Sequence, residues 1–471
     1  MNLKEFRARN SDILELNWND QRCAIRLYNQ SRIIVSITEI TIAGSICRDS
    51  GFTSMKYSLF SIVLHALNRH KGWTEAWKKP PLQGQYDIVI IGGGGHGLAT
   101  AYYLAKLNNN LRVAVLEKGW IGGGNTGRNT TGIRSNYFLK ENANFYDYSL
   151  KLWENLTQEL NFNLMFSQRG WVSLCHSSSD VERLTTRYNA LRLNDIDGEM
   201  LTLKQLKIML PDLNYSPTAR FPIAGAVIQR RAGVARHDAV AWGYARAASR
   251  LGIDIIENCE VTAINVNKNS VTSIQTSKGN VVCEKIGICV AGHSSEITRM
   301  VGLKLPMETH LLQAMVTEPV KPFLNTGVVS PALHCYISQT DKGEILIGGG
   351  IDGYNSYSQR GTWPKIEEVV SGAISMFPRL RGLKLMRTWA GVMDMTMDGA
   401  PIIGQTPIKH LYINGGWCIG GFKAIPGAGR CFAQNIIDDE PHPLTAPFSL
   451  DRFRTGRLLN ESGAGNFPHK Q

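Results

Sequence analysis

The sequence predicts an α/β fold in which a Rossmann-like dinucleotide-binding domain is interleaved with a mixed-sheet α+β domain. Three stretches predict the first domain. A strand, a glycine turn, a helix and a second strand occupy 86–117, a buried strand ends in Ala291-Gly292, and a glycine-rich strand-to-helix turn begins at Leu411. Between the last two, residues 300–385 alternate short strands with turns around one helix, which is typical of a mixed sheet.

The first stretch is a βαβ unit. It opens with the apolar, β-branched run Ile88–Ile91, whose length suits a buried strand. Apolar residues then recur at helical spacing from Leu98 to Ala105, and a second apolar run, Val113–Leu116, completes the unit.

The turn between strand and helix reads Gly92-x-Gly94-x-x-Gly97. Gly92 permits a tight turn, Gly94 lets the backbone approach a pyrophosphate, and Gly97 lets the helix pack closely on the strand. The helix N-terminus presents N–H groups and a positive dipole end to the phosphates. Glu117 lies where an acid can accept hydrogen bonds from a ribose. The unit predicts a dinucleotide site without separating NAD from FAD.

Composition narrows the function classes. The chain has 471 residues, enough for two domains. Its nine scattered cysteines include no C-x-x-C pair, which argues against a disulfide framework or a cysteine zinc site and for a reducing, cytoplasmic setting, and we expect no metal site. The net charge of +12 comes without a basic run or a nucleic-acid motif, so we expect anionic cofactors and partner subunits, although a generally basic surface explains the charge equally well. No stretch is long and apolar enough to span a membrane.

The N-terminal part differs from the rest. Residues 1–54 show no clear hydrophobic period, and we expect them to be an atypical extension ahead of a natural start at Met55. Residues 55–85 read as an amphipathic arm that ends in a linker at Pro80 and Pro81.

Further along, a loop rich in Gly, Thr and Asn, 119–137, carries Arg128 and Arg134 and suits a backbone lying against a ligand. Helices are expected at about 141–160, 181–193, 203–210, 238–251 and 366–376 and from Gly427, and strands at about 286–290, 314–317, 334–338, 344–348 and 411–414.

A series of motifs runs in one order from Met55 to the C-terminus: VIIGGGGHGLATAYYLAK, VLEKGW, GGGNTGRNTT, MFSQRG, RAGVARHDAVAWG, ISQTDKGE, GGIDGYNSY and NGGWCIGGFKAIPGAG. The series resembles the FAD-dependent amine oxidases of the D-amino-acid oxidase type, and most closely the β subunits of heterotetrameric sarcosine oxidases. The resemblance implies non-covalent FAD with its pyrophosphate on Gly92, Gly94, Gly95, His96 and Gly97 and its ribose on Glu117. It also implies FAD contacts from Asn125, Thr126, Thr130 and Thr131 in the loop, from Val261 on the adenine side, and from Gly420, Gly421 and Lys423 on the isoalloxazine side.

The resemblance implies a second flavin as well. His237, in RAGVARHD, matches the histidine that carries covalent FMN, and a neutral imidazole can attack an electron-poor flavin methyl carbon. Taken alone, a histidine before a helix is more often a cap or a surface residue. The FMN is expected at an interface with the α subunit, in a complex completed by γ and δ subunits.

Two cationic residues match the substrate side of the family. Arg134 matches the arginine that holds the substrate carboxylate, which a guanidinium grips with two parallel hydrogen bonds. Arg128 is the second choice for this role. Lys423, in GGFKA, matches a lysine near flavin N5 in the monomeric enzymes, where a fixed charge stabilises superoxide, and positioning of the substrate or tuning of FAD is its alternative role.

The resulting hypothesis is a β subunit that oxidises sarcosine at FAD and passes electrons to FMN on His237 and then to oxygen. The products are glycine, hydrogen peroxide and formaldehyde, or 5,10-methylenetetrahydrofolate with tetrahydrofolate bound by the α subunit. The alternatives are an oxidase or dehydrogenase of another secondary amine, such as dimethylglycine or an opine, and a non-catalytic flavoprotein that assists assembly. Cys418-Ile419 stands where the family has GWGTGG, which leaves the substrate less defined than the cofactor.

The expected domains interleave along the chain. The FAD-binding domain is expected at 86–150, 231–298 and 386–450, and the substrate- and FMN-side domain at 151–230 and 299–385. A C-terminal tail, 451–471, follows them.

Overall fold

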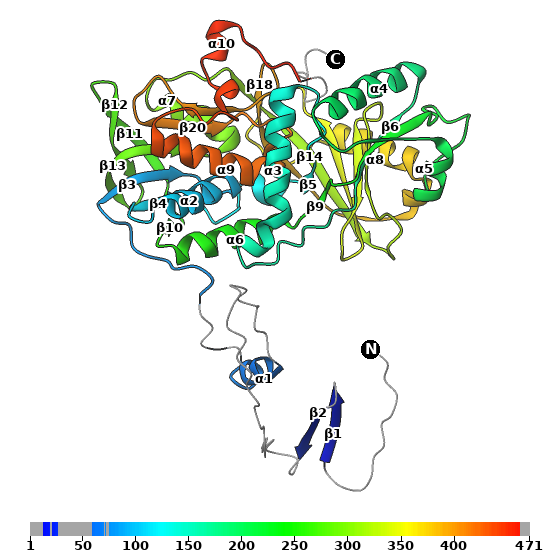
Figure 1. Cartoon of the computed structure of the whole chain (residues 1–471), viewed down its shortest axis with the longest axis horizontal. Helices are drawn as coiled ribbons and strands as arrows, with labels where there is room; N and C mark the ends of the chain where they lie inside the picture. The colour runs from blue at the N-terminus through cyan, green and yellow to red at the C-terminus, as the bar shows by residue number, and fades with distance from the viewer. Residues whose placement is uncertain (1–12, 19–20, 27–58, 70, 72–74, 462–471) are drawn as a thin grey trace. The chain divides into compact units, whose positions relative to one another are not determined.

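The computed structural model describes residues 13–18, 21–26, 59–69, 71 and 75–461, and the chain separates into two units, 1–57 and 58–471 (Figure 1). In the first unit, β1 (Ile13–Trp18) pairs antiparallel with β2 (Gln21–Arg26). The start expected at Met55 lies outside the described residues.

The β1–β2 pairing was not predicted. Leu14, Leu16 and Trp18 do alternate with polar residues, but this period of two covers a single short strand and does not stand out from its surroundings.

In the unit 58–471, one eight-stranded sheet contains the predicted βαβ unit and lies on the left in Figure 1. Its order is β10-β4-β3-β13-β12-β11, with β20 also beside β13 and β19 beside β20. The strands are β3 (Gln85–Ile91), β4 (Val113–Leu116), β10 (Asp254–Ile256), β11 (Val261–Asn267), β12 (Ser270–Thr276), β13 (Gly279–Ile288), β19 (Ile402–Gln405) and β20 (Leu411–Gly415). Because β10, β4, β3, β13 and β20 are parallel, their carboxyl ends meet at one edge.

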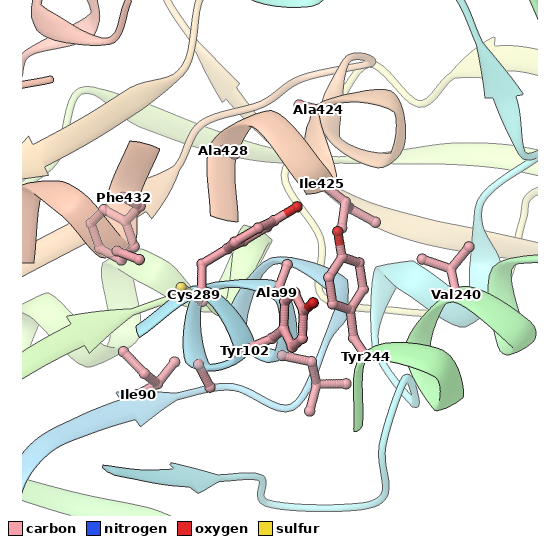
Figure 2. Close-up of a cluster of buried hydrophobic side chains, with 14 of the residues drawn as sticks. Ile90, Ala99, Tyr102, Val240, Tyr244, Cys289, Ala424, Ile425, Ala428 and Phe432 are labelled. Atoms are coloured by element: carbon pink, nitrogen blue, oxygen red, sulfur yellow. The ribbon is translucent and has the colours of Figure 1, made fainter. Parts of the chain in front are cut away.

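Three helices pack together beside this sheet: α2 (Gly95–Leu107), α6 (His237–Arg250) and α9 (Gly421–Asp438). Figure 2 shows their shared core, in which Tyr102 of α2 and Tyr244 of α6 meet edge to face with ring centroids 5.7 Å apart. A Cβ added to Gly429 would lie 2.5 Å from the Cβ of Ala99, so small residues let α9 approach α2 closely.

The start of α9 corrects one expectation. The helix was expected from about Gly427, but α9 begins at Gly421 and contains Pro426, which has no N–H for the helical ladder. Tertiary packing explains the difference, since Ala424, Ile425 and Ala428 are all buried in the shared core and together outweigh one missing hydrogen bond.

The second sheet, on the right in Figure 1, has the order β18-β14-β17-β16-β15-β6-β8-β7. Its strands are β6 (Trp171–Cys175), β7 (Glu199–Leu201), β8 (Gly225–Gln229), β14 (Met307–Pro319), β15 (Gly327–Ser330), β16 (Cys335–Gln339), β17 (Glu344–Ile351) and β18 (Leu385–Thr396). β18 lies in a segment expected for the FAD-binding domain, yet it pairs with β14 along nearly its whole length.

The remaining helices are α1 (Leu59–Leu67), α3 (Lys140–Glu159), α4 (Ser178–Leu193), α5 (Leu203–Met209), α7 (Ser294–Arg299), α8 (Trp363–Met376) and α10 (Arg452–Thr455). Those expected from sequence begin and end within three residues of the prediction. Across the described ranges, no helix has both the length and the apolarity needed to cross a membrane.

A short two-stranded ladder links distant parts of the chain. β5 (Gly132–Ile133) pairs antiparallel with β9 (Gly233–Val234), with Gly132 opposite Val234 and Ile133 opposite Gly233. The ladder therefore brings Arg134, which follows β5, and His237, which follows β9, onto neighbouring segments.

Candidate active site

A cavity of about 1750 Å³ lies between the two sheets, at the carboxyl ends of the parallel strands. Typical small-molecule sites enclose roughly 300–1,000 Å³, so this cavity has room for an extended cofactor together with a small substrate. Such a crevice beyond the carboxyl ends of parallel strands is where open α/β sheets bind their ligands.

The glycine turn after β3 has no space for side chains. Gly92 has a φ of +111°, and a Cβ there would lie 2.4 Å from the carbonyl oxygen of Cys289. A Cβ on Gly97 would lie 1.9 Å from the carbonyl oxygen of Gly92. Gly92, Gly94 and Gly95 line the cavity, whereas Gly97 packs against the strand. The turn thus presents bare backbone at the start of α2, as a pyrophosphate requires.

Glu117, at the end of β4, is held in the cavity wall by two backbone donors. Its Oε2 accepts a hydrogen bond from Gly93 N at 2.8 Å, and its Oε1 accepts one from Gly119 N at 2.8 Å. Each carboxylate oxygen keeps a second lone pair, so the fixed carboxylate can also accept hydrogen bonds from a ribose.

The loop after β4 lies against the turn and the second sheet. Thr126 Oγ1 accepts a hydrogen bond from Gly95 N at 2.9 Å, and Asn125 exchanges two hydrogen bonds with the backbone of Val392 in β18. Thr130 Oγ1 donates to the hydroxyl of Tyr336 at 2.9 Å. All four predicted loop residues line the cavity, namely Asn125, Thr126, Thr130 and Thr131, and so does Val261.

His96 joins the start of α2 to the start of α9. Its Nε2 lies 2.8 Å from the carbonyl oxygen of Gly421, and its ring stacks on Trp417 with centroids 5.0 Å apart. Burial lowers the pKa of His96 to about 4, so the ring is neutral and donates from Nε2 to that carbonyl. Nδ1 then becomes a buried acceptor with no hydrogen-bond partner among the described residues, in a wall of the cavity.

The cationic residues predicted for the substrate both line the cavity. Arg134 lies over the ring of Tyr137, 5.1 Å from its centroid, and its Nη1 donates to Asn136 Oδ1 at 2.6 Å. Lys423 is 6% exposed, and its Nζ donates to the carbonyl oxygen of Ile419 at 2.9 Å. Burial and then the charge of Arg134 lower the pKa of Lys423 well below its usual range. A bound anion between the two cations would offset both effects.

Arg128 also lines the cavity, but its guanidinium is engaged with the loop itself. It donates to the carbonyl oxygens of Gly123 and Gly124 and, through Nη2, to Gln359 Oε1 at 2.6 Å. The hydrogen bonds favour Arg134 over Arg128 as the residue that meets a substrate.

Two further predicted residues lie outside the cavity wall. A Cβ on Gly420 would lie 2.0 Å from the hydroxyl of Tyr146, so Gly420 is packed against α3. His237 is the half-buried first residue of α6, and burial, followed by the nearby charges of Arg236 and Arg387, lowers its pKa.

Sequence reasoning missed other residues of the wall, including Asp394. Its Oδ2 accepts a hydrogen bond from Gly416 N at 2.6 Å, and burial raises the pKa of its carboxyl to about 6. Asp394 sits in β18 with no motif around it, so nothing in the local sequence separates it from an ordinary strand residue.

Comparison with known proteins agrees with this geometry. The family model for the FAD dependent oxidoreductases matches residues 87–435. The sarcosine oxidase subunit β of Rhizobium meliloti (strain 1021) is 51% identical over 415 residues, which cover 88% of this chain and 100% of that protein. The chain belongs to the sarcosine oxidase β-subunit family. The subunit β of Rhodobacter capsulatus is 45% identical, again over 88% of this chain and 100% of that protein.

A solved structure supports the fold of this sarcosine oxidase β-subunit family member. The L-proline dehydrogenase of P. horikoshii superposes with a TM-score of 0.75 at 28% identity, over 80% of this chain and 100% of that one. The chain is thus a FAD-dependent oxidoreductase. The bare glycine turn, the fixed Glu117 carboxylate and the unpartnered Nδ1 of His96 fit such a cofactor.

Proposed function

We propose that the protein is the β subunit of a sarcosine oxidase that oxidises sarcosine at non-covalent FAD and passes the electrons to covalent FMN and then to oxygen. The observation that carries this proposal is that half-buried Arg134 and buried Lys423, two basic side chains, share one cavity with the glycine turn. A secondary amine with one carboxylate fits that combination.

The cofactor would lie with its pyrophosphate at the start of α2 and its ribose on Glu117. Gly421 and Lys423, at the start of α9, would lie on its isoalloxazine side. FAD supplies the acceptor for a hydride from the N-methyl carbon. The protein's part is to hold the amine against that acceptor and to exclude water from the cavity.

The substrate carboxylate would bind between Arg134 and Lys423. Both side chains line the cavity, and the charge of Arg134 adds to burial in lowering the pKa of Lys423. A carboxylate bonded to both groups fixes the direction in which the N-methyl group points. We therefore assign Lys423 to substrate positioning rather than to oxygen activation.

His237 is our proposed attachment point for FMN. The lowered pKa of His237 keeps its imidazole neutral, which is the nucleophilic form. Arg387 lies near enough to act on this pKa and offers a positive partner for an FMN phosphate. The α subunit would cover this flavin, and the γ and δ subunits would complete the complex.

The products would be glycine and hydrogen peroxide, with the methyl carbon leaving as formaldehyde or as 5,10-methylenetetrahydrofolate on the α subunit. We place the complex in the cytoplasm, since the cysteines that the structure describes are all buried free thiols.

Anaerobic addition of sarcosine to the purified complex tests the oxidation directly. The flavin absorbance should bleach with sarcosine, and less readily with dimethylglycine. A complex that bleaches with another secondary amine and not with sarcosine would refute the proposed substrate, and one that bleaches with none would be a non-catalytic flavoprotein.

A denaturing gel tests the second flavin. Fluorescence should migrate with this chain in the wild type and be lost in His237→Ala. Fluorescence that persists in the variant would show that the flavin is attached elsewhere, and the matched variant Asp238→Asn should retain it.

A further inference from the structure

We propose that Glu461, in the C-terminal tail, is a positioning residue that sets the place of the substrate arginine Arg134 through Arg187 and Asn136. The inference rests on the proposed function, in which Arg134 binds the substrate carboxylate.

The carboxylate of Glu461 closes the start of α3. The N-cap position is held by Leu139, whose side chain cannot accept a hydrogen bond. Glu461, more than 300 residues further along the chain, instead fixes the backbone that leads into α3, accepting from Phe138 N at 2.6 Å, Leu139 N at 3.0 Å and Asn142 Nδ2 at 3.0 Å. A negative charge at a helix N-terminus is also favoured by the helix dipole.

The same carboxylate faces Arg187 of α4. Nη2 of Arg187 lies 3.6 Å from Oε1 of Glu461, whose side chain is only 1% exposed. Arg187 in turn holds the backbone of the loop that carries Arg134, because its Nε and Nη2 donate to the carbonyl oxygen of Asn136 at 3.2 and 2.8 Å. Asn136 then accepts from Arg134 Nη1 at 2.6 Å.

These contacts form an unbroken path from the tail to the substrate site. Each step is a hydrogen bond or an ion pair between buried or half-buried groups. Water does not readily replace these contacts, so a shift of Glu461 should also shift Arg134. The other side of the loop is fixed as well, since Ser135 N donates to Gln229 Oε1 at 2.9 Å.

Charge gives Glu461 a second effect on Arg187. Burial and then the charge of Arg134 lower the pKa of Arg187, while Glu461 acts in the opposite direction. Both guanidiniums line the cavity, and Lys423 adds a third cationic group beside Arg134. The Glu461 carboxylate therefore offsets part of the positive charge around Arg187 and helps to hold its guanidinium on the carbonyl oxygen of Asn136.

The variant Glu461→Gln keeps the shape of the side chain and removes its charge. In the assembled complex, KM for sarcosine and Kd for acetate, read from the flavin difference spectrum, should both rise by roughly tenfold, the size expected for one coupled contact. The kcat value and the FAD content should stay close to the wild type, because the reacting groups are untouched. Asp451→Asn is the matched control, since it removes an exposed carboxylate, paired with Arg454, from the same tail.

A second variant separates positioning from folding. Arg187→Met breaks the path while leaving the hydrogen bonds of Glu461 to Phe138 and Leu139 in place, and it should raise KM and Kd in the same way. Combining it with Glu461→Gln should add little. An unchanged KM and acetate Kd in Arg187→Met, in a complex whose wild type oxidises sarcosine, would overturn the inference. A wild-type complex that fails to oxidise sarcosine would instead overturn the proposed function.

Discussion

The buried ion pair between Asp398 and Arg452 fastens the C-terminal tail to the end of β18, and breaking it should destabilise the protein measurably. Arg452 is 2% exposed and Asp398 is 4% exposed. Nε and Nη2 of Arg452 donate to the two carboxylate oxygens at 2.7 and 2.9 Å, and Nη2 also donates to the carbonyl oxygen of Ala400 at 2.8 Å. Burial raises the pKa of Asp398, but Arg452 together with the backbone N–H groups of Leu459 and Ala400 more than offsets it, so the pKa lies below its usual value.

The size of the effect follows from the burial of both charges. Removing one partner of a buried pair costs about 3–5 kcal/mol, because the other charge is left without a partner. Unfolding entropy is about 2.1 cal/mol/K per residue, which gives roughly 0.9 kcal/mol/K for the unit 58–471. Arg452→Met should therefore lower the melting temperature by roughly 3–6 °C.

Thermal denaturation of the complex, followed by flavin fluorescence, measures this shift. The double variant Asp398→Leu, Arg452→Met should recover part of the loss, since apolar pairs often replace buried ion pairs without cost. Arg454→Met, which breaks an exposed pair of the same tail, should leave the melting temperature unchanged. An equal melting temperature for Arg452→Met and the wild type would refute the reasoning.

Three further changes test the cavity. Gly97→Ala places a Cβ 1.9 Å from a backbone oxygen and should give a chain with little bound flavin. The control Gly84→Ala, whose Cβ would have no neighbour within 4 Å, should keep its flavin, and the flavin absorbance per chain measures the difference. His96→Asn removes an imidazole whose pKa is about 4 in the folded protein and 6.5 in the unfolded chain. As the pH falls from 6.5 towards 4, the free energy of unfolding of the wild type should therefore decrease relative to that of the variant, by about 1.4 kcal/mol per pH unit. Melting curves across this range would contradict the argument if the two proteins stayed parallel. Lys423→Met should raise KM for sarcosine roughly a hundredfold in steady-state assays, the loss expected for a buried charged contact, and an unchanged KM would remove Lys423 from the carboxylate site.

The sign of the His96 effect follows from proton binding. Below its ordinary pKa the unfolded chain binds a proton that the buried imidazole does not, so acid favours unfolding. The stability due to the neutral ring is therefore complete above pH 6.5 and is lost as the pH falls towards the folded value of about 4.

Local sequence was sufficient for the parts of the fold that repeat a short pattern. The βαβ unit around Gly92 and the helices of the second sheet follow from apolar spacing, which depends on neighbours in the chain. The start of α9 did not follow, because burial of Ala424 and Ile425 in the shared core favours it while Pro426 argues locally against it. The pairing of β18 with β14 is likewise a long-range choice that no local signal encodes.

The same division applies to the candidate site. The glycines of the first turn and Glu117 could be predicted from their spacing, and the loop threonines from the family resemblance, and nearly all of these residues line the cavity. Asp394 and Glu461 could not, because their importance comes from burial and from partners far along the chain. Motifs in the sequence identify residues that line the cavity, whereas residues that hold its wall in place are identified only from the folded structure.

The two-rung ladder of β5 and β9 has a consequence for how such an enzyme can change. It sets Arg134 and His237, each just beyond one of its strands, in a fixed relation. An insertion that widened the substrate end would shift the register by a residue and turn the side chains of the other strand to the opposite face. Under the roles proposed for Arg134 and His237, a change of substrate made at this ladder would also disturb the exit route for electrons, so new specificity would have to come from the cavity's other walls.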